Sequence, residues 1–204
     1  MEAAGATPVQ ECTYDFGYTD AKSFVMTSSI IEGVGVSAYL GAAQDITSPD
    51  YLTAAAQIAP IEARHTAYIR KQLGEAGMPQ PFDTPLGLNQ VYTLASPFIV
   101  SCPPSNPPLP VKAFPSVALA TTGPLHAGQT ITLTTSATGA TNAAFLSLNG
   151  PVFQAARATS GGYTTTIPSG FGGQTYIVLT NSAGAVSDAN TVAGPAAVEV
   201  ADVY

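Results

Sequence analysis

The chain has 204 residues, of which 46% are hydrophobic and only 9% are charged, so it is long enough and apolar enough to bury a core. The formal net charge of −7 and the scattering of six basic residues exclude the clustered positive charge that nucleic-acid binding requires. No apolar run approaches the roughly 20 residues of a membrane span, so no transmembrane segment is expected. The opening MEAAGATPVQ lacks a basic region followed by an apolar one, and no signal peptide is visible in it.

Residues 20–77 predict two helices. The first begins near Phe24 and runs to about Ala43, because Asp20 or Ser23 can serve as its N-cap.

The second expected helix starts in ITSPDYLTAAAQ. There Ser48 is the predicted N-cap and Pro49 the first helical residue, a position where proline costs no hydrogen bond. The helix should run to Leu73, because Gly74 follows. Pro60 lies inside it and is expected to kink it, since proline removes one backbone hydrogen bond.

Residues 78–115 are dense in proline, which is incompatible with regular helix or a central strand. We expect an ordered, extended wrap packed on the helices through VYTLASPFIV, with one short helical turn near Leu88 to Ala95. Residues 1–115 are therefore expected to form one helical domain with its wrap.

From Ser116 the pattern changes to short β-rich segments separated by Gly, Asn and Ser. These segments are SVALATTG, QTITLTTSA, AAFLSLNG, YTTTIPSG, QTYIVLTNSAG and AAVEVADVY. Six or seven short strands in about 90 residues predict a small immunoglobulin-like β-sandwich over residues 116–204. The chain as a whole is thus expected to be an α+β protein with two domains.

Each expected helix carries a glutamate on a mainly apolar face. Glu62 and His65 are three residues apart in PIEARHTAYIRKQL and point to the same side, and Glu32 lies on the apolar face of the first helix. Helical bundles that hold two metals use this arrangement, with one Glu from each of two helices and Glu-x-x-His from each of the other two. The alternative is a solvated helix face on which Arg64 pairs with a carboxylate.

Two cysteines, Cys12 and Cys102, flank the helical part. The low charge and the high content of Thr, Ser and Gly fit an extracellular protein with one disulfide, and two free buried thiols are the alternative.

Three stretches together resemble the fungal ferritin-like proteins that are described as stress-response, desiccation-related or late-sexual-development proteins. They are SSIIEGVGVSAYLGAAQDITSPDYLTAAAQIAPIEARHTAYIRKQL, PQPFDTPLGLNQVYTLASPFIVSCP and LPVKAFP. The resemblance implies a secreted or cell-surface protein in which a ferritin-like bundle precedes a β-domain. It implies that Glu32, Glu62 and His65 occupy metal-ligand positions of the second helix pair. It also implies a disulfide between Cys12 and Cys102, because ECTYDF and IVSCP look like the family's cysteine segments.

The chain departs from that family at its start. Members begin with a first helix pair that carries its own Glu and Glu-x-x-His, whereas MEAAGATPVQECTYDF resembles the end of the second helix and the crossover after it. The resemblance therefore implies a partial bundle with half of the ligand set. Either the wrap and the β-domain cover the apolar stripe, or two chains associate. A twofold homodimer would bring together two copies of Glu32, Glu62 and His65.

Two functions remain open at this point. The first is a ferritin-like protein that binds iron or manganese, with two metals only in a dimer, and that acts in iron or redox chemistry under stress. The alternative is a non-catalytic secreted or cell-wall protein whose helical part is a metal-free remnant and whose β-sandwich packs into or adheres to wall material. Both place the chain outside the cell or in the cell wall, and neither decides whether it is an enzyme.

Overall fold

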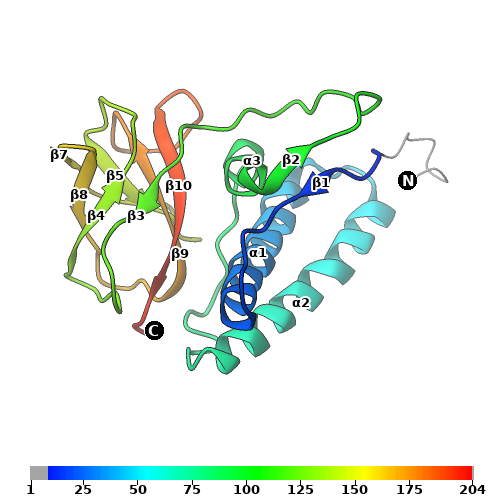
Figure 1. The fold of residues 1–204 in the computed structure, drawn as a ribbon, viewed down its shortest axis with the longest axis horizontal. Helices are drawn as coiled ribbons and strands as arrows, with labels where there is room; N and C mark the ends of the chain where they lie inside the picture. The colour runs from blue at the N-terminus through cyan, green and yellow to red at the C-terminus, as the bar shows by residue number, and fades with distance from the viewer. Residues whose placement is uncertain (1–8, 204) are drawn as a thin grey trace.

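The structure, a computed structural model, describes residues 9–203 and is an α+β fold (Figure 1). The helices are α1 (Ala21–Ala42), α2 (Pro49–Gln72) and α3 (Leu88–Ala95). The strands are β1 (Thr13–Tyr14), β2 (Ile99–Ser101), β3 (Ala118–Leu119), β4 (Thr130–Thr134), β5 (Asn142–Phe145), β6 (Val152–Ala155), β7 (Arg157–Thr159), β8 (Gly162–Thr166), β9 (Gly173–Thr180) and β10 (Thr191–Val200). The expected α+β class is confirmed.

Helix α1 begins at Ala21, three residues earlier than the sequence predicts. Of the two candidate caps, Asp20 is the N-cap, and its carboxylate accepts a hydrogen bond from the backbone N–H of Ser23 at 2.7 Å. The Ser23 hydroxyl in turn accepts from the backbone N–H of Asp20 at 3.1 Å. Both candidate residues therefore take part in one reciprocal cap.

Helix α2 has the predicted start and stop. Ser48 is its N-cap, Pro49 its first residue and Leu73 its C-cap, after which Gly74 takes the left-handed conformation with φ of 81°. The helix continues through Pro60 as one element, so the proline does not divide it.

The proline-rich segment contains more regular structure than expected. Its short turn is an eight-residue helix, α3, and strand β2 pairs antiparallel with β1 near the N-terminus. The short helical turn expected near Leu88 to Ala95 is confirmed with those bounds. The wider expectation that proline excludes regular helix from residues 78–115 is wrong, because the prolines lie outside α3. The disulfide between Cys12 and Cys102, implied by the resemblance, is confirmed beside the β1–β2 pair.

Residues from β3 onward form two four-stranded antiparallel sheets, in the orders β3-β4-β8-β7 and β10-β9-β5-β6. Side chains of both sheets share one core, which includes Ile131, Leu133, Phe145, Ile177 and Leu179. The predicted segments do not include strands β6 and β7. Each is a short strand at the edge of its sheet. The immunoglobulin-like type of this β region stays a prediction.

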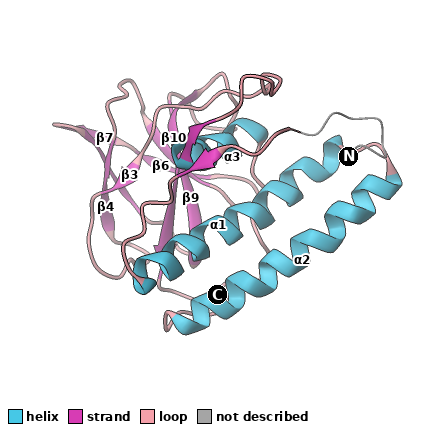
Figure 2. Cartoon of the chain, turned by 45° about the vertical axis from the view of Figure 1, so that its right-hand side comes forward, coloured by secondary structure: helices cyan, strands magenta, loops and turns pink. Residues whose placement is uncertain are grey.

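Helix α1 lies between α2 and the β10-β9-β5-β6 sheet (Figure 2). Val34 of α1, Leu86 and Tyr176 of β9 form a small buried cluster at this junction. The junction crosses the expected boundary between residues 115 and 116, so that division stays a prediction.

The stretch Ala21–Asp45, with a mean hydropathy of 1.3, is long and apolar enough to cross a membrane by length and composition alone. The core helix of a globular protein passes the same test, and α1 packs against both α2 and α3. The expectation that the chain has no transmembrane segment therefore stays a prediction.

Candidate functional site

Glu32 on α1 and His65 on α2 lie in direct contact. The Nδ1 atom of His65 is 3.2 Å and 3.3 Å from the two carboxylate oxygens of Glu32. The His65 side chain is 56% exposed and that of Glu32 is 28% exposed, so this pair lies at the open edge of the helix–helix contact. At such exposure the pair contributes little to stability.

Glu62 lies deeper between the two helices and has an unpartnered atom. Its Oε2 is buried and, among the described residues, has no hydrogen-bond partner. Burial raises the pKa of Glu62, the charge of Glu32 raises it further, and His65 opposes both. A carboxylate kept in this position at neutral pH is uncompensated, which is costly in the absence of a ligand.

A glycine on α1 makes room for this carboxylate. A Cβ atom at Gly35 would overlap the carboxylate of Glu62. The close approach of Glu62 to α1 therefore depends on glycine at this position. Gly35 lies in the α1 motif GVGVSAY, one turn after Glu32.

The side of α2 that carries Glu62 and His65 is only partly buried. Glu62 and Ile69 are half-buried, but Tyr51, Ile58 and His65 are exposed. Of the two alternatives, cover by the wrap and the β-domain does not extend to Tyr51 and Ile58, because the sheet packs on α1, and association of two chains stays a prediction. An apolar row that includes Tyr51, Ile58, Ile61 and Tyr68 is thus left on the surface.

Glu32, Glu62 and His65 are chemically suited to bind a metal ion, but they do not form a complete set of ligands. Two carboxylates and an imidazole suit Fe(II) or Mn(II), and the unpartnered Glu62 oxygen is available for coordination. Within residues 9–203, however, no group of three or more His, Cys, Asp or Glu side chains is arranged to hold a metal ion. Glu32, Glu62 and His65 would hold it from one side only.

A second group of polar residues, which sequence reasoning missed, lies between α1 and β9. The hydroxyl of Tyr176 lies 2.9 Å from that of Ser37, accepts from Gln174 at 2.9 Å and donates to the carbonyl of Gly33 at 3.2 Å. Burial raises the pKa of Tyr176 to about 12, so the phenol stays protonated. An alternating strand such as QTYIVLT gives no signal that its tyrosine meets a helix more than 130 residues away.

These residues border a cavity of about 630 Å³ between the helices, β9 and residues 77–84. Its polar lining includes Arg64, Thr66 and Asp83, and its apolar lining includes Val36 and Phe82. The mixture of both charge signs with apolar surface selects no single class of ligand.

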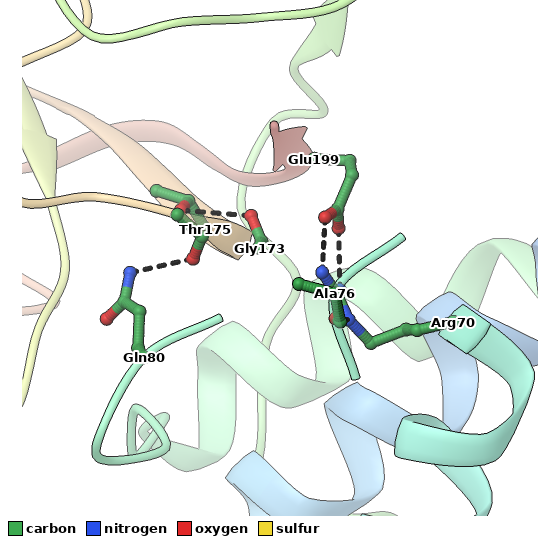
Figure 3. A network of polar contacts seen from close by, with 7 residues as sticks. Arg70, Ala76, Gln80, Gly173, Thr175 and Glu199 are labelled. Atoms are coloured by element: carbon green, nitrogen blue, oxygen red, sulfur yellow. Dashed lines mark hydrogen bonds and ion pairs between the residues drawn. The ribbon is translucent and has the colours of Figure 1, made fainter. Parts of the chain in front are cut away.

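Close by, Arg70 of α2 and Glu199 of β10 form an ion pair that joins the helices to the sheet (Figure 3). Arg70 Nη1 donates to Glu199 Oε2 at 2.8 Å, Nη2 donates to Oε1, and Nε donates to the carbonyl of Ala76 at 2.8 Å. The Arg70 side chain is only 4% exposed, and burial raises the pKa of Glu199 while Arg70 opposes that shift. The pair holds the end of α2 in place and takes no part in the Glu32–Glu62–His65 group.

Residues 1–75 match a family model described as a ferritin-like domain. The match ends just after α2, so it covers the helix pair that carries Glu32, Glu62 and His65. The α1–α2 pair therefore lies in a ferritin-like region of the chain, and α3 lies outside the matched residues. No curated protein matches the chain.

Proposed function

We propose that the α1–α2 pair is one half of a carboxylate–histidine metal site for iron or manganese. The observation that carries the proposal is the buried Glu62 oxygen that has no partner beside Glu32 and His65. A protein that used this position only for stability would gain by replacing the carboxylate with an uncharged side chain.

In this proposal each side chain has a separate task. Glu62 supplies a carboxylate oxygen from inside the helix pair, Glu32 supplies a second carboxylate, and His65 supplies an imidazole nitrogen from the open edge. Glu32 also accepts from His65 Nδ1, which leaves Nε2 as the ligand atom and orients the ring. A bound iron would supply one-electron redox chemistry, which suits a role in stress protection.

The remaining ligands come from a second copy of the chain. The exposed apolar row of α2 runs along the same helix as Glu62 and His65, and such a row is stable when another helix pair covers it. A twofold dimer places the two ligand groups opposite each other and doubles the number of carboxylates.

The test combines light-scattering mass with metal analysis on one chromatographic peak of the purified chain after exposure to Fe(II) or Mn(II). We expect a dimer that carries about two metals, as in two-metal bundles. Glu62→Gln should lose the metal while remaining folded, and Asp45→Asn, an exposed carboxylate outside the site, should keep it. A metal-free monomer, or equal uptake by Glu62→Gln, would show that the proposal is wrong.

A second function has one observation in its favour, which is that the described residues hold no assembled metal group. In that case the chain is a secreted or cell-wall structural or adhesive protein whose helices are a metal-free remnant. The disulfide supports an oxidising, extracellular location for either function. Retention of the metal-free chain by isolated cell-wall material, unchanged in Glu62→Gln, would favour this alternative.

A further inference from the structure

The chain between β2 and β3 crosses the outside of the fold as a long extended segment (Figure 1). One part of this segment is the sequence PPLP at residues 107–110, which we call the proline strap. All four of its residues are exposed, and the side chain of Leu109 is 57% exposed. The strap therefore lies on the surface along its whole length.

The composition of the strap restricts its backbone to one conformation. Its three prolines hold φ near −65°, and Leu109 precedes a proline, which disfavours helical backbone at that residue. Such a sequence is typical of the polyproline II helix, which has three residues per turn and rises about 3.1 Å per residue. Pro107 and Pro110 then lie on the same side of the strap, about 9 Å apart.

The backbone of the strap is unpaired. Its prolines have no N–H group, and among the described residues the backbone of residues 107–110 makes no hydrogen bond. The carbonyl groups of the strap are therefore available to a partner, as they are in polyproline II segments that other proteins recognise.

Hydrogen bonds fix the chain on both sides of the strap. Before it, the Asn106 side chain accepts from the backbone N–H of Gln10 at 2.6 Å and donates to the Gln10 carbonyl at 2.8 Å. After it, the backbone N–H of Lys112 donates to Asn89 Oδ1 at 2.7 Å. Because both ends are fixed, the strap loses little conformational entropy when a partner binds it.

Lys112 adds a positive charge two residues after the strap. It is the single lysine or arginine between Lys71 and Arg157. Its side chain is exposed and, within residues 9–203, makes no hydrogen bond or ion pair. The strap and Lys112 together therefore present the pattern Pro-x-x-Pro-x-Lys with every side chain of the pattern except that of Val111 exposed.

We propose that the proline strap is a docking segment for a partner protein whose groove is lined by Tyr and Trp side chains and has an acidic residue at one end. The rings of Pro107 and Pro110 pack between the aromatic side chains, and the Tyr and Trp polar groups donate hydrogen bonds to the strap carbonyls. The acidic residue pairs with Lys112 and sets the direction in which the groove reads the strap. The proposal is independent of the metal site, because the strap lies outside the α1–α2 pair.

The test uses an SH3 domain that selects Pro-x-x-Pro followed by a basic residue, as a probe of this groove chemistry and not as the partner itself. The full, disulfide-bonded chain is titrated with the probe, and binding is followed by calorimetry and by backbone amide shifts in NMR spectra. We expect saturable binding with a Kd below about 1 mM and shifts centred on Leu109, Val111 and Lys112. The same probe with its groove Trp replaced by Ala should bind at least about tenfold more weakly. Absence of saturation, or equal binding by the altered probe, would overturn the assignment.

Three variants and one control locate the contact. Pro107→Ala and Pro110→Ala should each weaken binding of the probe by about tenfold or more, because each removes a ring that fills the groove. Lys112→Gln should weaken binding by about threefold, and by less at high salt. Pro85→Ala replaces an exposed proline outside the strap and should leave binding unchanged. An equal loss in Pro85→Ala would show that the contact is elsewhere and that the proposal is wrong.

Urea unfolding of the same variants separates lost docking from misfolding. The strap prolines are exposed and their backbone is unpaired, so the midpoints of Pro107→Ala and Pro110→Ala should stay close to that of the natural chain. If these folded variants bound the probe as tightly as the natural chain, the strap would be a spacer alone and the proposal would fail.

Discussion

At the scale of single residues, the two members of the Arg70–Glu199 pair differ in how well they tolerate loss of the partner. Arg70 is almost fully buried and cannot lose its proton, whereas Glu199 is about a third exposed and its pKa is already raised. We expect Glu199→Gln to lower the free energy of unfolding by about 2–4 kcal/mol and Arg70→Met by about half as much. Urea unfolding of both variants and of the double variant checks this. Equal losses would mean that the guanidinium finds water or another partner.

The pH dependence of stability at Glu62 follows from its environment. Because burial and Glu32 raise the pKa of Glu62, the folded chain holds this proton more tightly than the unfolded chain. Its contribution to stability therefore increases as the pH falls from above the raised pKa to below the ordinary value of 4.5. Without metal, Glu62→Gln should be more stable than the natural chain at pH 7 by about 1 kcal/mol, from relief of a buried unpaired atom.

This advantage of Glu62→Gln should shrink as the pH is lowered, because the natural carboxylate then becomes neutral as well. Urea unfolding of both chains at several pH values measures the difference, and other groups that titrate, such as Glu199, cancel in it. If the difference in unfolding free energy stayed constant across these pH values, Glu62 would not be a destabilising charged group at neutral pH.

At the scale of elements, two glycines of α1 should respond oppositely to the same substitution. In a helix interior, alanine is favoured over glycine by about 1 kcal/mol. A Cβ at Gly35 meets only the flexible end of Glu62, whereas a Cβ at Gly41 would overlap the backbone carbonyl of buried Leu86. We expect Gly35→Ala to be neutral or stabilising and Gly41→Ala to cost about 1–3 kcal/mol.

Thermal or urea unfolding of the two alanine variants separates these effects. Gly35→Ala should also weaken metal uptake, because it displaces the Glu62 carboxylate. If Gly41→Ala were as stable as the natural chain, the segment at Leu86 would be able to move away from α1.

An element could be predicted from the sequence where the residues that determine it lie close together in the chain. Ser48, Pro49 and Gly74 specify the ends of α2 within a few residues, so its bounds could be predicted. Strands β6 and β7 are short, lie at sheet edges and carry little alternation, so their existence depends on pairing with distant strands. The short helix α3 could be placed at Leu88–Ala95 because its eight residues contain no proline, although the prolines around it argue against regular structure.

The candidate site was predictable only in part, for the same reason. Helical periodicity shows that Glu62 and His65 share a side of α2, and antiparallel packing brings Glu32 to His65. Which side of the helix pair the sheets cover depends on β9 and β10, which lie more than 100 residues away. The exposure of His65 could not be read from the local pattern.

At the scale of the whole molecule, the disulfide links the residue before β1 to the residue after β2, within the proline-rich segment. It joins Cys12 to Cys102, a separation of 90 residues, and so encloses both long helices. In the chain-entropy view a loop of this length is worth about 4 kcal/mol. We expect Cys12→Ser with Cys102→Ser to lower the free energy of unfolding by about 2–4 kcal/mol, measured by urea unfolding against the oxidised chain. A change below 1 kcal/mol would mean that the β1–β2 pair already orders this loop in the unfolded chain.

The Arg70–Glu199 pair also bears on how the protein is made. Its two members are 129 residues apart, and Glu199 lies in β10, the last strand of its sheet to be synthesised. At translation rates of about 5–20 residues per second, Glu199 is synthesised roughly 6–26 s after Arg70. During that interval the inner side of α1 and the guanidinium of Arg70 lack the sheet that covers them. The helix pair therefore reaches its final packing only after β10 has been synthesised, and chaperones have a defined surface to protect until then.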